Sequence, residues 1–172
     1  SHNISRTSQE IFAASSHEKA ISAAKSGHLD SELVAISNVS TDGCMRAPNL
    51  EKMAQLKPAF IDSGTVTAAT SSPLTDGAAG LLVCSEDFAL ENGLNPLASI
   101  VSTSVAGVPP EIMGYGPVPA SEKALQRAGL NMDDIDVIEL NEAFSAQALA
   151  CMKDMNLELD DTRINIDGGA LA

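Results

Sequence analysis

Residues 136–154, DVIELNEAFSAQALACMKD, decide the fold class of this chain. The first part, 136–140, is rich in β-branched and apolar residues and predicts a strand, and 142–154 has the length of a helix. The predicted helix is apolar nearly all round, with Ala143, Phe144 and Leu149 among its members, and such a helix is usually buried between layers. A strand followed at once by a buried helix indicates an α/β fold.

The same alternation holds from residue 80 to the end of the chain and favours a mixed or parallel sheet with helices on its faces. The predicted strands there are AAGLLVCS at 78–85, 97–106, 136–140 and 163–166, and the predicted helices are 86–92, 120–128 and 142–154. The region before Gly64 is more irregular. It predicts a helix over 6–26, capped by Ser5 or Thr7 and ended by Gly27, then a short strand at 32–37, a loop at 38–49 and a short helix at 50–56.

The composition excludes several classes of protein. The chain has 172 residues, which is room for one domain or parts of two, and 44% of them are hydrophobic. No apolar run approaches the ~18 residues that a membrane span needs, and no leader marks a secreted protein. A net charge of −13 and only 3% aromatic residues argue against a nucleic-acid-binding surface.

The cysteines and histidines predict neither a disulfide framework nor a metal site. Three cysteines stand at wide spacing, Cys44, Cys84 and Cys151, which suits a reducing compartment. The three histidines all lie in the first fifth of the chain, and none has the spacing of a metal ligand.

Three segments carry more than secondary structure: GTVTAATSSPLTDGAAGLLVCSE at 64–86, MGYGPVPAS at 113–121, and VIELNEAFSAQ at 137–147 with INIDGGALA behind it. In this order, and with NISRTSQEIFAASSHEKA at 3–20 and LKPAF at 56–60, they resemble the thiolase family over essentially the whole chain. The NEAF wording is similar to the acetyl-CoA acetyl- and acyltransferases. The MGYGPVPAS and SSPLTDGAA wording looks most like degradative 3-ketoacyl-CoA thiolases of fatty acid beta-oxidation.

The resemblance implies the thiolase fold, in which two similar halves, each a five-stranded mixed sheet with helices, stack in αβαβα layers. By the match, residues 1–74 belong to a loop domain that covers coenzyme A, 75–95 end the first half, and 96–172 open the second. We expect both halves to be incomplete here, with sheet edges and apolar faces left uncovered.

The resemblance also implies the chemistry. A cysteine thiolate attacks the 3-keto carbonyl, and fixed donors stabilise the oxyanion of the departing acetyl-CoA enolate. By the match, Asn141 helps to hold a water for one oxyanion hole. The alternative for Asn141 is a cap for the helix beginning at Glu142, a role that asparagine fills well.

Further positions match those that bind the pantetheine arm or the nucleotide of coenzyme A. Ser72 matches a serine that contacts pantetheine, although a turn hydroxyl before Pro73 is the alternative. The apolar tunnel positions are Ala59, Phe60, Ala68, Leu74, Ala143 and Phe144, and Met113 lies near the acyl group; ordinary core packing is their alternative. Arg46 and Lys52 are candidates for the phosphates, or else ordinary solvated cations.

The reactive residues of the family are mostly absent from these 172 residues. The resemblance places the nucleophilic cysteine before residue 1, and the catalytic histidine and second cysteine after residue 172. Cys84, on an apolar strand, and Cys151, on a buried helix, are predicted to be small hydrophobes, and Cys44 a loop residue with no matched role.

The predicted function is therefore that of a thiolase, as part of a longer parent enzyme that cleaves 3-ketoacyl-CoA to acetyl-CoA and a shortened acyl-CoA, or runs the reverse Claisen condensation. The resemblance implies coenzyme A as substrate, no covalently bound cofactor, and a homodimer or tetramer, with a beta-oxidation complex as a further partner. The location would be cytoplasmic in a bacterium and otherwise mitochondrial or peroxisomal. The alternatives are a truncated, inactive piece that binds coenzyme A or a partner, and an unrelated soluble α/β protein.

Overall fold

The computed structural model describes residues 2–172, and its longest element is α1, Arg6–Ser26. The Ser5 hydroxyl accepts a hydrogen bond from the Ser8 N–H over 3.0 Å, which caps the helix, and Gly27 ends it in the left-handed region at φ 71°. Both helix ends therefore agree with the sequence signals. Because α1 buries Ala13, Ser16 and Ala23, one side faces the rest of the molecule.

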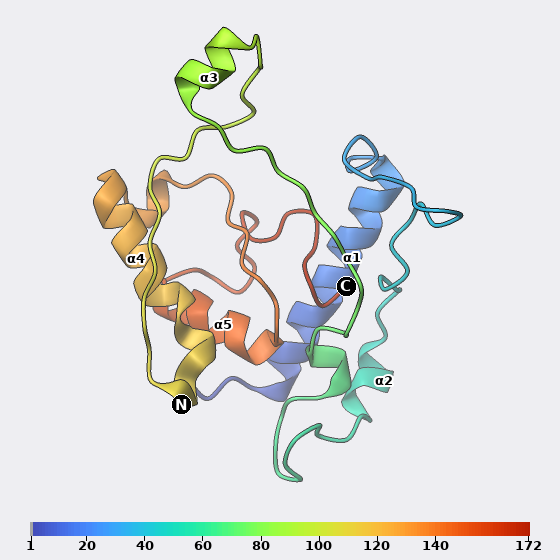
Figure 1. Cartoon of the computed structure of the whole chain (residues 1–172). Helices are drawn as coiled ribbons and strands as arrows, with labels where there is room; N and C mark the ends of the chain where they lie inside the picture. Colours follow the sequence, from blue (N-terminus) through green and yellow to red (C-terminus); the bar gives the residue numbers. More distant parts are fainter. Residues whose placement is uncertain (1) are drawn as a thin grey trace.

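The other helices are short and match the predicted positions, with shifts at their ends. They are α2 at Leu50–Ala54, α3 at Glu86–Glu91, α4 at Pro117–Ala128 and α5 at Ser145–Asp154, with 3₁₀ turns η1 at Ala68–Thr70, η2 at Pro110–Tyr115 and η3 at Met132–Asp134. Figure 1 shows α5 between α4 and α1, with α2 beside the lower part of α1. No helix within residues 2–172 combines the length and apolar character that crossing a membrane requires.

The predicted strands do not form ladders in the described residues, which contain only three isolated bridges. Ile138 and Ile164 form a parallel bridge in which the Ile138 N–H donates to the Arg163 carbonyl and the Asn165 N–H donates to the Ile138 carbonyl, each over 2.9 Å. The predicted strands 136–140 and 163–166 therefore do lie side by side in parallel. The short strand predicted at 32–37 is reduced to a tight turn, with Ile36 bridged to Val39.

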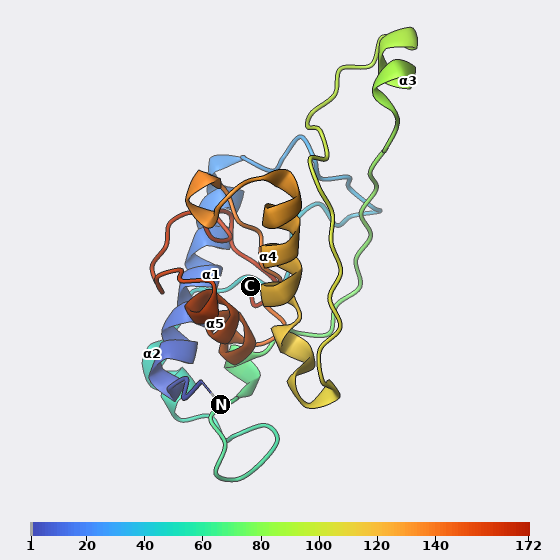
Figure 2. The same ribbon diagram turned by 90° about the vertical axis from the view of Figure 1, so that its left-hand side faces the viewer.

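The two most apolar predicted strands, 78–85 and 97–106, run as extended chain without a partner strand. They lead up to α3 and back, and α3 stands apart from the other helices in two views at right angles (Figures 1 and 2). Large apolar side chains along them are exposed, among them Leu81, 86%, and Leu97, 96%. A strand needs a neighbour to bond its main chain, and the described residues supply none here.

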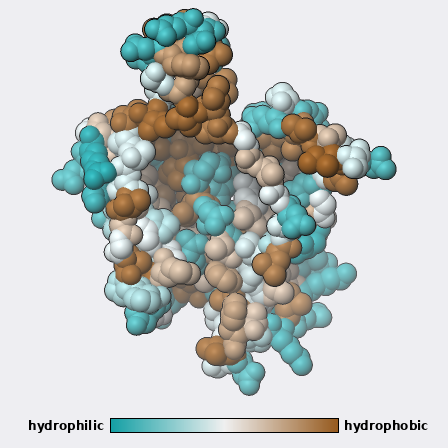
Figure 3. All heavy atoms as spheres, in the orientation of Figure 1, coloured by the Kyte–Doolittle hydropathy of each residue, from teal (hydrophilic) through white to brown (hydrophobic). Residues whose placement is uncertain are grey.

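The return segment 101–108 nevertheless keeps the two-residue period of a strand. Its even-numbered residues are half-buried and its odd-numbered residues are exposed. The Ser102 hydroxyl donates to the Ala124 carbonyl over 2.7 Å, and the Arg127 guanidinium donates to the Thr103 carbonyl, so one face lies on α4. Figure 3 shows a hydrophobic band just below α3, where the two extended segments meet that helix.

The main core surrounds α5, as an apolar helix between layers should. It joins α5 and the residues after it to α4 and to the parallel pair, through Val118, Leu140, Ala148, Leu149, Cys151, Met152, Met155, Leu157 and Ile164. A smaller cluster of Ala13, Met53 and Leu171 lies between α1, α2 and the end of the chain, and Phe12 packs against both clusters. These clusters hold the loop before α5 between α1 and the residues around 165–171.

Candidate functional site

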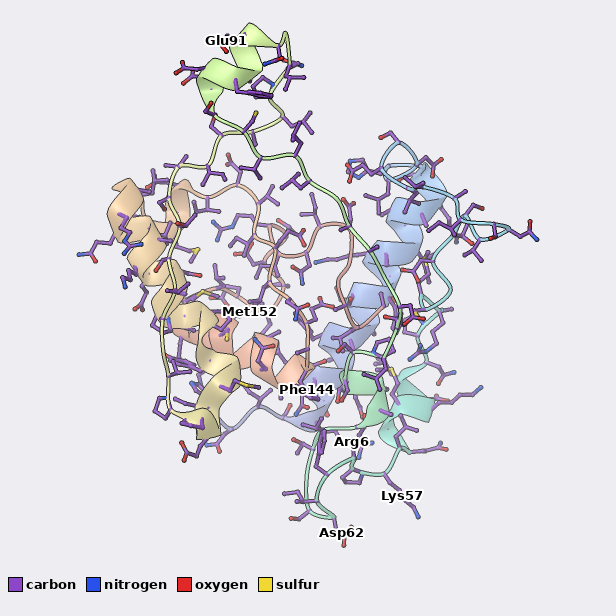
Figure 4. The ribbon with its side chains drawn as sticks, in the orientation of Figure 1. Arg6, Lys57, Asp62, Glu91, Phe144 and Met152 are labelled. Carbon is purple, nitrogen blue, oxygen red and sulfur yellow. The ribbon has the colours of Figure 1, made fainter. Side chains whose placement is uncertain are left out.

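Two segments far apart in sequence meet at the start of α5. Ser71 and Phe144 form an antiparallel bridge, and the Ser72 N–H donates to the Ala143 carbonyl over 3.0 Å. The Phe60 and Phe144 rings lie edge to face, with their centroids 5.9 Å apart. The structure therefore brings together four residues that the resemblance assigns to the pantetheine tunnel, and Figure 4 shows Phe144 at the beginning of α5.

A rigid turn holds Ser72 in this position. Thr67 and Thr70 are fully buried, and the Thr67 N–H donates to the Thr70 hydroxyl over 2.9 Å. The Ser71 hydroxyl donates to the Thr67 carbonyl over 2.8 Å, which closes the turn. The half-buried Ser72 hydroxyl itself makes no side-chain hydrogen bond within residues 2–172, so the structure does not give it the alternative role of a turn hydroxyl.

Asn141 lies just before this meeting point, and its side chain is exposed. The alternative interpretation, a helix cap, is wrong, because α5 begins at Ser145 and the residue in the cap position is Phe144, which offers no side-chain acceptor. The Asn141 amide makes no hydrogen bond to the part of the chain that the structure describes. Both amide donors are therefore free to bind a water or a substrate oxygen.

The next residue, Glu142, is one that sequence reasoning missed. Its side chain is 1% exposed, and its carboxylate accepts hydrogen bonds from the Ser16 hydroxyl over 2.6 Å and the Asn165 amide over 2.7 Å. The Leu171 N–H adds a third over 3.2 Å. The signal in the sequence was a charged residue at the start of the largely apolar predicted helix 142–154, but spacing alone could not identify its partners.

A cavity of about 640 Å³ lies beside the Ser72 turn. Its wall combines that turn with the loop around Cys44 and with the chain end at Gly169–Ala172. The cavity is open to solvent, and no single element forms it. It therefore brings the predicted coenzyme A serine next to the end of the GGALA segment.

The remaining predicted site residues lie on the surface around these segments. The Ala59 N–H donates to the Val66 carbonyl over 2.8 Å, which closes the loop that carries Phe60. The alternative of ordinary core packing is wrong for Phe60, Leu74 and Met113, which are 70%, 104% and 79% exposed. Arg46, Lys52, Ala59 and Ala68 are exposed as well, and within residues 2–172 no hydrogen bond or ion pair joins Arg46 or Lys52 to the Ser72 turn.

His17 and Arg46 connect α1 to the loop that borders the cavity. The Arg46 N–H donates to His17 Nδ1 over 3.4 Å. Burial lowers the pKa of His17, the positive charge of Arg46 lowers it further, and the Glu142 carboxylate acts in the opposite direction. His17 is therefore held in its neutral form more strongly than a free histidine.

The three cysteines are all free thiols in different surroundings. Cys151 is buried, as predicted, and burial raises the pKa of its thiol, so it behaves as a small apolar residue. The prediction for Cys84 is wrong: it is exposed, because its segment is extended chain without a partner strand. No group of three or more potential metal ligands occurs within residues 2–172.

Comparison with known proteins matches almost the whole chain to one family. Residues 1–87 match the model described as "Thiolase, N-terminal domain", and residues 94–172 match "Thiolase, C-terminal domain". The chain is 49% identical to a 3-ketoacyl-CoA thiolase of Cronobacter sakazakii over 183 aligned residues, which cover 99% of this chain and 47% of that protein. It is 50% identical, with the same coverage, to a 3-ketoacyl-CoA thiolase of Salmonella typhimurium.

Among solved structures, the chain resembles the acetyl-CoA acetyltransferase of Bacillus anthracis, with a TM-score of 0.90 and 42% identity over 98% of this chain and 44% of that one. The chain thus spans about half the length of the relatives that it matches, and it has a portion of the αβαβα-layered thiolase fold. The predicted fold class is confirmed. The matched domains and the shared structure show that this chain belongs to the thiolase family.

Proposed function

We propose that the protein containing this chain is a thiolase enzyme that cleaves a 3-ketoacyl-CoA with coenzyme A, giving acetyl-CoA and a shortened acyl-CoA, or runs the reverse Claisen condensation. The observation that carries the proposal is the pairing of Ser71–Ser72 with Ala143–Phe144, which puts the predicted pantetheine serine beside the loop of Asn141. The names of the bacterial relatives support the same reaction class.

In this proposal Asn141 donates a hydrogen bond to a water in the oxyanion hole, where the enolate oxygen of the departing acetyl-CoA gains charge. Its exposed amide, not engaged by the protein, supports this role. Ser72 contacts the pantetheine arm, and the apolar residues Ala59, Phe60, Ala68, Leu74, Ala143 and Phe144 line its path, with Met113 near the acyl group. Arg46 and Lys52 bind phosphates of the nucleotide, although both are solvated here.

The larger organisation follows from the same proposal. Residues 1–74 belong to the loop domain that covers coenzyme A, 75–95 end the first thiolase half, and 96–172 open the second. Coenzyme A is a substrate, and no covalently bound cofactor takes part. We further propose a homodimer or tetramer in the cytoplasm of a bacterium, supported by the bacterial origin of the relatives, with a beta-oxidation complex as partner.

The experiment is a steady-state assay of acetoacetyl-CoA thiolysis with the natural protein that contains these residues. Asn141→Ala should lower kcat by roughly 100-fold or more, as loss of an oxyanion donor does elsewhere. Asn95, also an exposed asparagine, lies in the extended segment before 97–106, and Asn95→Ala serves as the matched control that should change kcat less than twofold.

A second candidate, a binding piece without catalysis, rests on the cavity that borders Ser72. Titration calorimetry with coenzyme A separates the two functions. Binding without any turnover of acetoacetyl-CoA by the natural protein would favour the binding piece, and turnover that is unchanged by Asn141→Ala would remove the proposed role of Asn141.

A further inference from the structure

Glu142 carries a buried acidic group without an ion-pair partner in the part of the chain that the structure describes. All three hydrogen bonds to its carboxylate come from neutral groups: a hydroxyl, an amide side chain and a main-chain N–H. A buried carboxylate is unfavourable unless its oxygens are satisfied, and an apolar residue in a core is usually at least as stable. Packing alone therefore does not explain why a glutamate stands at position 142.

The three donors come from different parts of the chain. Ser16 lies on α1, Asn165 follows the parallel bridge, and Leu171 is at the chain end that borders the cavity. The Gly169 N–H also donates to the Ser16 hydroxyl over 3.0 Å, and a Cβ at Gly169 would collide with the Glu142 carboxylate. One side chain thus ties α1 and the 165–171 segment to the loop before α5.

Asn141 is fixed by its neighbours on both sides. Before it, the Asn165 side chain accepts a hydrogen bond from the Leu140 N–H over 2.8 Å and donates to the Leu140 carbonyl over 2.9 Å. After it, the Glu142 carboxylate is held as described, and the Ala143 carbonyl accepts from Ser72. The main chain is therefore held on both sides of Asn141, whose own side chain is exposed and makes no hydrogen bond within residues 2–172.

We propose that Glu142 is a positioning residue for the proposed thiolase reaction. Its carboxylate sets the main chain at Asn141 relative to α1 and the 165–171 segment, so that the Asn141 amide and the cavity wall keep a fixed geometry. The proposal rests on the proposed function, because it assigns Glu142 an effect that passes through Asn141.

An acid is needed at this position because its two oxygens accept from both sides at once. The Asn165 amide donates to Oε1, and the Ser16 hydroxyl and Leu171 N–H donate to Oε2. In Glu142→Gln the shape is kept, but one oxygen becomes an NH₂ group that must face either the Asn165 amide donor or the Leu171 N–H. Two donors then oppose each other in a buried place, and the loop must move.

The experiment is a double-mutant cycle on acetoacetyl-CoA thiolysis by the natural protein, with Glu142→Gln, Asn141→Ala and the combination. Since a misplacement of about 1 Å can cost roughly 100-fold in rate, we expect Glu142→Gln to lower kcat by about 30- to 100-fold, with KM for coenzyme A changed less than threefold. If Glu142 acts through Asn141, adding Glu142→Gln to Asn141→Ala should lower kcat less than about threefold further.

Ser16→Ala is the second variant, for the case that Glu142→Gln does not fold, since it removes one of the three hydrogen bonds to Glu142, together with the one from the Gly169 N–H, with little change of volume. It should lower kcat about 3- to 10-fold, while Ser15→Ala on the neighbouring, half-buried position of α1 leaves kcat unchanged. Circular dichroism gives the folded fraction of each variant and active-site titration gives the concentration of competent sites, so that each kcat is expressed per folded molecule.

Three outcomes are decisive. A wild-type protein without thiolysis overturns the proposed function and this inference together. If the wild type is active and neither Ser16→Ala nor Glu142→Gln changes its kcat, only the inference is overturned. Independent, multiplicative losses in the Asn141→Ala background also overturn it, because they would show that Glu142 affects kcat by a route that does not pass through Asn141.

Discussion

Gly168 occupies a position where both the backbone and the packing require glycine, so Gly168→Ala should be strongly destabilising. Its φ is +86°, and a Cβ placed there would lie 2.7 Å from Ala20 Cβ, from the Ala20 nitrogen and from the Ser16 carbonyl oxygen. Two of these three atoms belong to the backbone of α1. They cannot move aside as a flexible side chain can, so the helix or the 165–171 segment must shift.

The magnitude has two parts. Left-handed backbone costs a residue with a Cβ about 1–2 kcal/mol, and overpacking a tight contact costs about 1–3 kcal/mol more. Gly129 separates the parts, because its φ is +70° and nothing lies within 4 Å of a Cβ built there. We therefore expect Gly129→Ala to lose about 1–2 kcal/mol of unfolding free energy, and Gly168→Ala about 2–5 kcal/mol.

Urea unfolding followed by circular dichroism measures both variants against the wild type, with the midpoint and slope reported together. We expect a larger midpoint shift for Gly168→Ala than for Gly129→Ala, at an unchanged slope. Equal losses for the two variants would refute it, because they would mean that only backbone conformation matters and that the contact between Gly168 and α1 is not tight in solution.

Other perturbations test separate parts of the structure. Arg6 donates to the carbonyls of Met53, Ala54 and Leu56 at the end of α2, so Arg6→Ala should cost about 2 kcal/mol and speed hydrogen exchange in 50–60; unchanged exchange there would contradict this. The pKa of His17 in the folded state is below its ordinary value near 6.5, so on acidification the unfolded chain takes up the proton before the folded chain does. The contribution of neutral His17 to stability is therefore fully present above pH 6.5 and is lost as the pH falls below it. His17→Gln should remove this loss of stability below pH 6.5, and urea midpoints measured across pH would show it. If the midpoints of the variant and the wild type fell equally with pH, that result would count against the burial of His17. The buried Cys151 thiol, with its raised pKa, should react with a thiol reagent at least ~10-fold more slowly than Cys44, and equal rates would be inconsistent with its burial.

The local signals predicted the helices well, because capping and stopping residues act within one turn. Ser5 and Gly27 mark the ends of α1 in the structure as they do in the sequence, and Gly129 directly follows the last residue of α4. The sequence predicts that α5 begins at Glu142, three residues before its observed start at Ser145, because Glu142 and Ala143 are good helix formers by themselves. Tertiary contacts decide otherwise: Ala143 and Phe144 pair with the Ser72 turn, and an extended segment that is paired cannot also be helix.

Interactions between distant segments were harder to predict. An apolar run such as 78–85 predicts a strand, yet a strand exists only with a partner, and none lies beside it in the described residues. The contacts of Glu142 with Ser16 and Asn165 join positions more than 20 residues apart, for which no local spacing gives a signal. The proximity of Phe60 to Phe144 was anticipated only through the family resemblance.

The extended segment 97–108 affects how copies of this chain associate with one another in solution. Its exposed side chains include Leu97, Val101 and Val105, and no hydrogen bond between two main-chain groups joins it to another segment of the described chain, so copies that collide could pair along it. The net charge of −13 opposes such collisions through mutual repulsion. At 0.1 M salt the repulsion is screened beyond a Debye length of about 10 Å. Added salt should therefore lower the colloidal stability of the protein without changing its fold.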